Sequence, residues 1–247
     1  MLLDLADTSI QRYIYFLREW EPNEAKIIKS ALREGDVFLD LGANVGYFSL
    51  LAAQVVGATG KVYAFEAQPA ICVQLKENVN LNGFVNVQIM NLAIADRISD
   101  FIVEDVSGLG NRGAAMLIPR EPGMPVIKVA GTTIDEFCRS QQVKDVGLIK
   151  MDIEGSEMLA LKGMRDLLST PNAPDMLCEI NEPLLKRMGS SGNEIYSYMS
   201  GMGYQMYQSS KRGLERVVAK EFAAHSDPLG DNYFFSKRLD LPEQFSI

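Results

Sequence analysis

Two short apolar segments, each ending in a carboxylate and set about 25 residues apart, constrain this chain more than any other feature. The first ends in Asp40, just before a turn that contains Gly42 and Gly46, and the second, Lys61–Phe65, is followed by Glu66. A strand, a glycine-bearing turn, a helix and a second strand ending in an acid form the layout of a nucleoside-cofactor site. The glycines let the backbone approach a ligand, and the carboxylate accepts both ribose hydroxyl protons.

Strand and helix patterns alternate along the rest of the chain. Helices are predicted over residues 23–33, 47–56, 69–81, 156–168 and 195–202, with a further helix capped by Thr132. Strands are predicted over residues 37–41, 61–65, 87–91, 146–151, 175–180, 204–207 and 233–236. This alternation predicts an α/β fold with a mostly parallel sheet and helices on both faces. We expect one domain over residues 1–247, with 1–34 as a helical cap on a core of 35–247.

Residues 100–125 are the least regular stretch and are rich in Gly and Pro. The run around Asn111 is interpreted as a loop or hairpin over the site. Long loops in compact domains are usually functional or disordered. A substrate lid and a plain surface hairpin are both open.

The charge balance argues against a nucleic-acid partner. The 247-residue chain has 24 basic and 32 acidic residues, for a formal net charge of -8. Affinity for nucleic acid depends on clustered Lys and Arg. We therefore expect a small-molecule substrate instead.

The spacing of the cysteines and the shortness of the apolar runs indicate the cellular compartment. Cys72, Cys138 and Cys178 have neither zinc spacing nor a disulfide pattern, which suggests reducing conditions. The N-terminus lacks a basic segment followed by a long apolar stretch, and no run approaches the roughly 18 apolar residues of a membrane span. A cytoplasmic protein with no membrane partner is the expectation.

Polar residues occur at or near the ends of successive predicted strands: Asp40, Glu66, Asn91, Asp152 and Glu179. Ligands of such sheets gather outside the carboxyl ends of the strands, so these side chains should line one rim. A single acid after a strand is more often a helix cap or a turn residue. Five in succession favour a site.

The first turn distinguishes between cofactors. A dinucleotide fingerprint has the pattern Gly-x-Gly-x-x-Gly, which lets a pyrophosphate approach the helix N-terminus. Here Asn44 occupies the place of the second glycine, in Gly42–Gly46. A polar side chain at this place suits the amino and carboxylate groups of a methionine moiety and favours S-adenosylmethionine.

Several blocks together resemble the FkbM family of S-adenosylmethionine-dependent methyltransferases. The resemblance covers roughly residues 20 to 208 and is strongest in Lys150-Met151-Asp152-Ile153-Glu154-Gly155-Ser156-Glu157. The other blocks are Trp20–Glu24, Asp40–Tyr47, Phe65-Glu66, Asn111-Arg112-Gly113 and Thr132–Phe137.

The resemblance implies a Rossmann-like class I methyltransferase with a seven-stranded sheet, whose last strand is antiparallel and inserted beside the fifth. It implies O-methylation of a hydroxyl on a sugar or natural product. Nitrogen or carboxyl methylation with the same cofactor stays open, as does a non-catalytic or NAD-binding protein. The implied cofactor contacts are Asp40, Gly42, Asn44 and Gly46 around the methionine end, Glu66 at the ribose, Ala67, Asn91 and Ala93 at the adenine, and Asp152 at the amino group or the reacting centre.

Removal of the acceptor proton needs a base, and Asp152, Glu154 and Glu179 are the candidates. Crowded carboxylates can raise the pKa of one of them toward neutrality. Lys150 is interpreted as either structural or catalytic, and Glu157 as a charge that supports the following helix.

Three further hypotheses concern residues outside this set. Asp152, Glu179 and Asn181 resemble in placement the Mg²⁺ ligands of catechol-type methyltransferases. His225, the single histidine, is an alternative base, although lone loop histidines are usually solvated. The aromatic residues from Tyr13 to Trp20 form a core element, a substrate wall or a homodimer contact.

Overall fold

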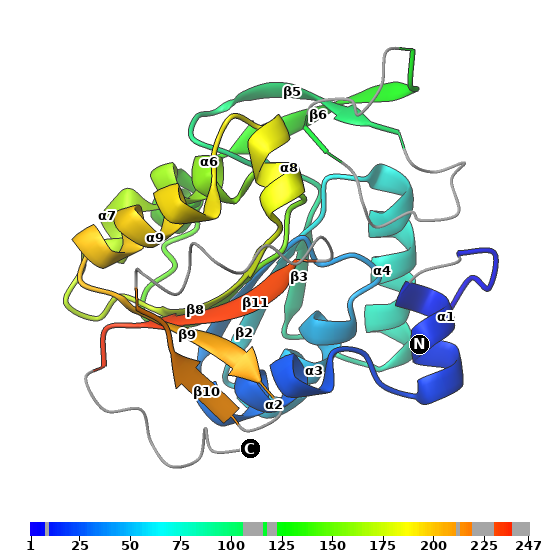
Figure 1. Cartoon of the computed structure of the whole chain (residues 1–247). Helices are drawn as coiled ribbons and strands as arrows, with labels where there is room; N and C mark the ends of the chain where they lie inside the picture. Colours follow the sequence, from blue (N-terminus) through cyan, green and yellow to red (C-terminus); the bar gives the residue numbers. More distant parts are fainter. Residues whose placement is uncertain (8–9, 106–115, 118–122, 211–212, 219–229, 239–247) are drawn as a thin grey trace.

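A computed structural model describes residues 1–7, 10–105, 116–117, 123–210, 213–218 and 230–238 of the chain. A large sheet crosses the molecule, with the strand order β10-β9-β11-β8-β7-β1-β2-β3 (Figure 1). Its strands are β1 (Val37–Leu41), β2 (Lys61–Phe65), β3 (Val87–Met90), β7 (Val146–Met151), β8 (Asp175–Ile180), β9 (Gln205–Ser210), β10 (Gly213–Arg216) and β11 (Asp231–Ser236).

Strand direction follows the predicted fold class. Strands β3, β2, β1, β7 and β8 are parallel. The last strand, β11, is antiparallel and lies between β8 and β9. The α/β Rossmann-like class and the inserted antiparallel strand are therefore confirmed.

The predicted count of seven strands is wrong by one, because the described part of the main sheet has eight. The additional strand is β10, which pairs antiparallel with β9 at the sheet edge. Its four residues, Gly213–Arg216, are too short and too polar to give an apolar alternation. A strand of this kind depends on the partner beside it rather than on its own pattern.

A second, three-stranded sheet lies at the edge of the molecule (Figure 1). It contains β4 (Ala93–Ile94), β5 (Ser99–Glu104) and β6 (Val126–Thr132), in the order β4-β6-β5. Strands β5 and β6 pair antiparallel, so the flanks of the expected irregular stretch form a β-ladder. The run around Asn111 lies outside the described residues, and the lid stays a prediction.

The described helices are α1 (Ile10–Leu17), α2 (Pro22–Ala31), α3 (Tyr47–Val56), α4 (Pro69–Leu81), α5 (Ile134–Ser140), α6 (Glu157–Lys162), α7 (Arg165–Leu168), α8 (Glu182–Arg187) and α9 (Gly192–Gly201). The single helix predicted over 156–168 is two helices, α6 and α7. They meet at Gly163, where a Cβ would lie 2.0 Å from the carbonyl oxygen of Ala95. The cap of α5 is Thr133 rather than Thr132, because the Thr133 side chain accepts a hydrogen bond from the N–H of Glu136.

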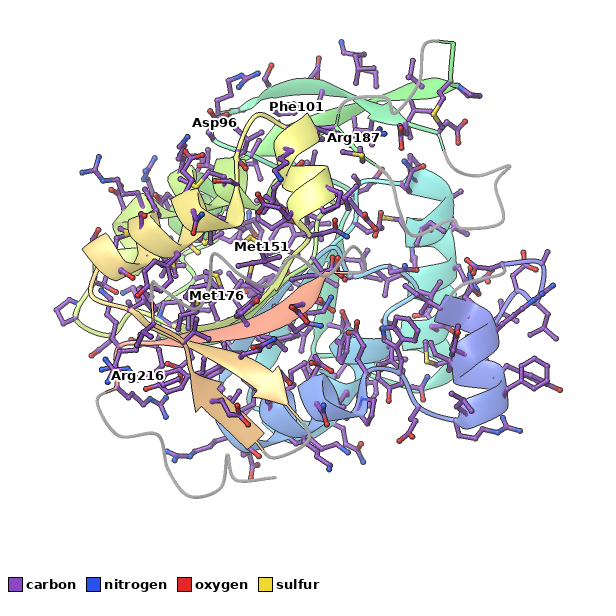
Figure 2. All side chains as sticks on the ribbon, in the orientation of Figure 1. Asp96, Phe101, Met151, Met176, Arg187 and Arg216 are labelled. Atoms are coloured by element: carbon purple, nitrogen blue, oxygen red, sulfur yellow. The ribbon has the colours of Figure 1, made fainter. Side chains whose placement is uncertain are left out.

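The main sheet separates two apolar layers. One face packs on α2 and α3 through Phe38, Leu148, Leu177 and Phe234. The other packs on α5, α6, α7 and α9, and its side chains include Met151 and Met176, which lie between the strands and these helices (Figure 2). Among the described residues, no helix is long and apolar enough to span a membrane.

Candidate functional site

Polar side chains collect at one end of the sheet face that packs on α2 and α3. Side chains two residues apart on a strand share a face. Three polar residues each come two positions after an apolar side chain of that face: Asp40, Lys150 and Glu179. In the antiparallel strand β11, Asn232 comes two positions before such an apolar side chain. The sheet register therefore brings four strands' polar side chains to the same rim. Asp40 lies opposite Lys150, and Glu179 lies opposite Asn232.

Asp40 is buried on this rim, with 1% of its surface exposed. One carboxylate oxygen, Oδ2, accepts a hydrogen bond from Ser49 Oγ at 2.6 Å, and the other has no hydrogen-bond partner among the described residues. Burial raises the pKa of Asp40, and the nearby Lys150 charge opposes this shift. A buried oxygen without a partner is expensive unless a ligand completes it.

Lys150 is a buried cation among carboxylates. Its Nζ lies 3.1 Å from Asp152 Oδ2 and 5.0 Å from the ring centroid of Phe48. Burial alone would lower the pKa of Lys150, but Asp152, Asp40 and Glu21 raise it above its ordinary value. Lys150 is therefore charged at neutral pH.

Asp152 and Glu179 form a carboxyl pair joined by a hydrogen bond. Burial, followed by the charge of Asp152, raises the pKa of Glu179 well above its ordinary value. Two carboxyls this close do not both ionise readily, so the pair holds one proton. Glu154, the third predicted base, borders a cavity together with Asp152. Its backbone is left-handed, at φ 55°.

The Glu66 side chain is held in a different way, by two backbone N–H groups. One belongs to the turn after β1, and the other lies two residues after Glu66. Its Oε2 accepts a hydrogen bond from the N–H of Asn44 at 2.9 Å, and its Oε1 accepts one from the N–H of Gln68 at 2.8 Å. Burial raises the pKa of Glu66 to about 7, although both hydrogen bonds oppose the shift. The carboxylate is fixed in place before any ligand binds.

Asn91 supports this turn from behind. Its Nδ2 donates to the carbonyl oxygens of Glu66 at 2.8 Å and of Ala67 at 2.9 Å. The side-chain amide of Asn91 is thus committed to the backbone that carries Glu66. Ala67 and Ala93, predicted at the adenine, both border a pocket.

Gly42 and Gly46 are required by the protein's own packing. A Cβ on Gly42 would lie 1.8 Å from the carbonyl oxygen of Asp152, and one on Gly46 would lie 2.4 Å from Leu75 Cδ1. Both glycines have positive φ, 85° and 93°. The close approach at Gly42 joins the turn after β1 to the turn after β7.

Two cavities meet at Gly42, Asp152 and Glu154. The first is bordered also by Glu66, Ala67, Ala93 and Ser156. The second is bordered also by Ile10, Trp20, Asn44, Tyr47 and Lys150. A single elongated ligand that reached into both would pass Asp152.

Glu157 stabilises the turn that follows β7. Its Oε1 accepts hydrogen bonds from the N–H groups of Ile153 and Gly155, both at 3.1 Å. These contacts fit the interpretation of Glu157 as a support for the start of α6. The neighbouring Ser156 borders the first cavity, and its buried Oγ has no hydrogen-bond partner in the described part of the chain.

The residues do not fit a magnesium ion. The Oδ1 of Asn181 accepts a hydrogen bond from the N–H of Leu184 at 3.3 Å and caps α8. Asp152 already pairs with the Lys150 ammonium, whose Nζ lies 3.1 Å from Asp152 Oδ2. In the described part of the chain, no group of three or more His, Cys, Asp or Glu side chains is placed to hold a metal. The Mg²⁺ hypothesis is not supported.

Two residues of the rim were missed by sequence reasoning, Glu21 and Asn232. Glu21 precedes α2, has φ 43° and forms a side-chain hydrogen bond with Asn232. The only signal for Glu21 was its place in the Trp20–Glu24 block. Asn232 gave none, because its position depends on the antiparallel pairing of β11. His225 lies outside the described residues.

Comparisons with known proteins agree with this architecture. A solved FkbM methyltransferase from Methylobacillus flagellatus KT matches with a TM-score of 0.54 at 16% identity, over 83% of this chain and 44% of that one. A solved precorrin-6y C5,15-methyltransferase from Geobacter metallireducens GS-15 matches with a TM-score of 0.51 at 10% identity, over 96% and 93% of the two chains. At these identities the likeness shows the fold.

Sequence comparison finds a relative named hexuronic acid methyltransferase AglP, from Haloferax volcanii. It is 26% identical over 153 residues, which are 62% of this chain and 59% of the relative. The chain thus spans less than two thirds of this relative's length. The methyltransferase FkbM domain model matches residues 40–206, well over half of the chain. This chain belongs to the FkbM methyltransferase domain family.

Proposed function

We propose that the protein is an S-adenosylmethionine-dependent O-methyltransferase whose acceptor is a hydroxyl of a sugar or a related small molecule. The single observation that carries the proposal is the Asp152–Glu179 carboxyl pair, of which Asp152 borders both cavities where they meet. The family match supports methyl transfer, and the pair supports an acceptor that loses a proton.

The two cavities suit the two halves of the cofactor. The cavity beside Glu66 would take the adenosine half, with the fixed carboxylate accepting the ribose hydroxyls. The cavity beside Asn44 would take the methionine half. Gly42 and Asp152, which border both cavities, would then hold the part of the cofactor between the two halves.

When bound, the cofactor supplies an electrophilic methyl group, whose transfer to an alcohol oxygen breaks the carbon–sulfur bond and leaves one proton to remove. The Asp152–Glu179 pair holds one proton and can accept a second. Lys150 fixes the orientation of Asp152 through the 3.1 Å contact. Positioning and proton removal are the contributions that such a site makes to a displacement reaction.

A sugar acceptor is favoured by the Haloferax volcanii relative, whose name specifies a hexuronic acid. Glu154 and Asp152 offer carboxylates that accept hydrogen bonds from sugar hydroxyls. Both residues also border the cavities from which the methyl group would be delivered.

The test is an acceptor panel with the purified protein. S-adenosylmethionine is offered with hexuronic acids, neutral hexoses, their glycosides and matching amino sugars, and S-adenosylhomocysteine and the methylated product are measured by mass spectrometry. We expect an O-methyl product from wild type and about 10²–10⁴-fold less from Asp152→Asn. A methyl group found on nitrogen or on a carboxylate would contradict the hydroxyl acceptor. Failure of wild type to bind S-adenosylhomocysteine would contradict the cofactor.

A further inference from the structure

Glu21 reaches the candidate site from the N-terminal cap, although more than 120 residues of sequence separate it from Lys150 and Asp152. Its backbone is left-handed, with φ 43° and ψ 70°. Its side chain bonds to Asn232 on β11. Glu21, Asn44 and Glu154 are three of the six described non-glycine residues with positive φ, and all three are at this rim. Strained backbone of this kind clusters at functional sites.

Lys150 poses an electrostatic problem for a cationic ligand. Among the described residues that border the two cavities, Lys150 is the single cationic side chain. S-adenosylmethionine carries a positive sulfonium, whereas S-adenosylhomocysteine is neutral at sulfur. An uncompensated ammonium at this rim would oppose the sulfonium and would leave the neutral product unaffected.

The carboxylates around Lys150 remove this repulsion. Asp152 after β7, Asp40 on β1 and Glu21 before α2 all raise the pKa of Lys150 through their charges. Neither Asp40 nor Glu21 is among the described residues that border the two cavities, whereas Asp152 borders both. Because Asp40 and Glu21 offset the charge of Lys150, the negative charge of Asp152 remains available to a ligand in the cavities.

We propose that Glu21 is a specificity-determining residue, which neutralises Lys150 and thereby favours the sulfonium substrate over the neutral S-adenosylhomocysteine product. This inference rests on the cofactor in the proposed function and is independent of the acceptor. It makes the N-terminal cap part of the site. It also gives the enzyme a way to release its product once the sulfur has lost its charge.

The charge of Glu21 depends on several groups packed around it. Burial raises the pKa of Glu21 to about 7. Asp152 after β7 and Glu24 on α2 add to this shift, whereas Lys150 and the hydrogen bond from Asn232 oppose it. Because the pKa is raised, Glu21 gains its negative charge as the pH rises through about 7. The preference for the sulfonium should therefore increase over the same range.

The test compares dissociation constants for S-adenosylmethionine and S-adenosylhomocysteine, measured by calorimetry on wild type, Glu21→Gln and Glu19→Gln. Glu19 is an exposed acid of the same segment and serves as the matched control. In Glu21→Gln at pH 8 we expect the preference for S-adenosylmethionine to fall about 3–10-fold, with the affinity for S-adenosylhomocysteine changed less than about 2-fold. Glu19→Gln should match wild type.

A second measurement uses pH on the unmodified protein. The wild-type preference should rise between pH 6 and pH 8, and this step should be missing in Glu21→Gln. An unchanged preference in folded Glu21→Gln overturns the proposal, and so does an equal loss of both ligands, which indicates a structural role. If Glu21→Gln does not fold, the absence of a wild-type pH step overturns it. Wild type that binds neither ligand contradicts the cofactor assignment itself.

Discussion

Two carboxylate sites at the same rim of the sheet are built on different principles. At the turn after β2, the two oxygens of Glu66 each accept a hydrogen bond from a backbone N–H, of Asn44 and Gln68. At the ends of β7 and β8, Asp152 and Glu179 contact each other and share a proton, with Lys150 alongside. The first carboxylate is positioned by local backbone, and the second pair by neighbours that are distant in sequence.

The two arrangements suit different tasks: one positions a ligand, and the other accepts or donates a proton. A carboxylate fixed by amides is a rigid acceptor for hydroxyl groups, and its geometry exists before binding. A pair of carboxyls in contact has an unusual proton affinity, because ionising both is unfavourable. We therefore propose that the Glu66 turn binds the cofactor and that the Asp152–Glu179 pair transfers the proton, and each proposal can be tested by substitution.

The largest effect is expected on turnover at the carboxyl pair. Asp152→Asn should lower the turnover number about 10²–10⁴-fold, because the pair loses its proton-accepting oxygen, while affinity for S-adenosylhomocysteine changes little. Steady-state kinetics, with an acceptor found in the panel described above, and calorimetry give the two values. Asp100→Asn, on an exposed acid of β5, is the control. Full turnover in Asp152→Asn, Glu154→Gln and Glu179→Gln would remove the carboxylate base.

Substitution at Gly42, where the two turns are in contact, should have the next largest effect, on the stability of the protein rather than on turnover. Gly42→Ala places a methyl group 1.8 Å from the carbonyl oxygen of Asp152, so β1 and β7 must separate locally. We expect the free energy of unfolding to fall by about 3–5 kcal/mol. Gly83→Ala is the matched control, since Gly83 also has positive φ but open space around it, and should cost about 1 kcal/mol. Equal losses in urea unfolding would show that only the backbone angle matters.

The sequence predicted the strands that carry or precede Glu66, Asp152 and Glu179 because their determinants are local, and it missed Glu21 and Asn232 because theirs are not. Strands β1 and β2 and helices α3 and α4 have the predicted bounds, since apolar runs, Gly57 and Pro69 mark their ends. Glu66 and its turn lie within this stretch. In contrast, Asn232 reaches the rim only through the pairing of β11 with β8, and Glu21 through a strained backbone. Neither signal is present in a local window of sequence.

The same reasoning explains the errors in the fold. Strand β10 is defined by its partner β9, and the division between α6 and α7 by the contact of Gly163 with Ala95. Both are tertiary effects that override local propensity. Choosing Thr133 over Thr132 as the cap of α5 required knowing which hydroxyl faces the N–H of Glu136.

A smaller effect is expected on binding at the Glu66 turn. Glu66→Ala should weaken binding of S-adenosylmethionine by about 1.5–3 kcal/mol, the cost of losing charge-assisted hydrogen bonds to the ribose. Calorimetry with 5′-methylthioadenosine should show a similar loss, because that compound keeps the ribose and lacks the amino-acid end. Normal affinity in folded Glu66→Ala would contradict the assignment of this turn to the cofactor.

The smallest effect concerns pH and the folding equilibrium. Burial raises the pKa of Glu66 to about 7 from an ordinary value of 4.5, so the folded protein binds this proton more tightly than the unfolded chain. Linkage then requires that the stabilisation be complete below about pH 4.5 and be lost as the pH rises through about 7. Wild type should therefore be less stable at pH 8 than at pH 5, as measured by urea unfolding. Glu66→Gln, which cannot ionise, should reduce that difference by about 1–2 kcal/mol, and Glu19→Gln should leave it unchanged. An identical pH dependence in wild type and Glu66→Gln would mean that Glu66 ionises as readily in the fold as in water, and that its two backbone hydrogen bonds fully offset its burial.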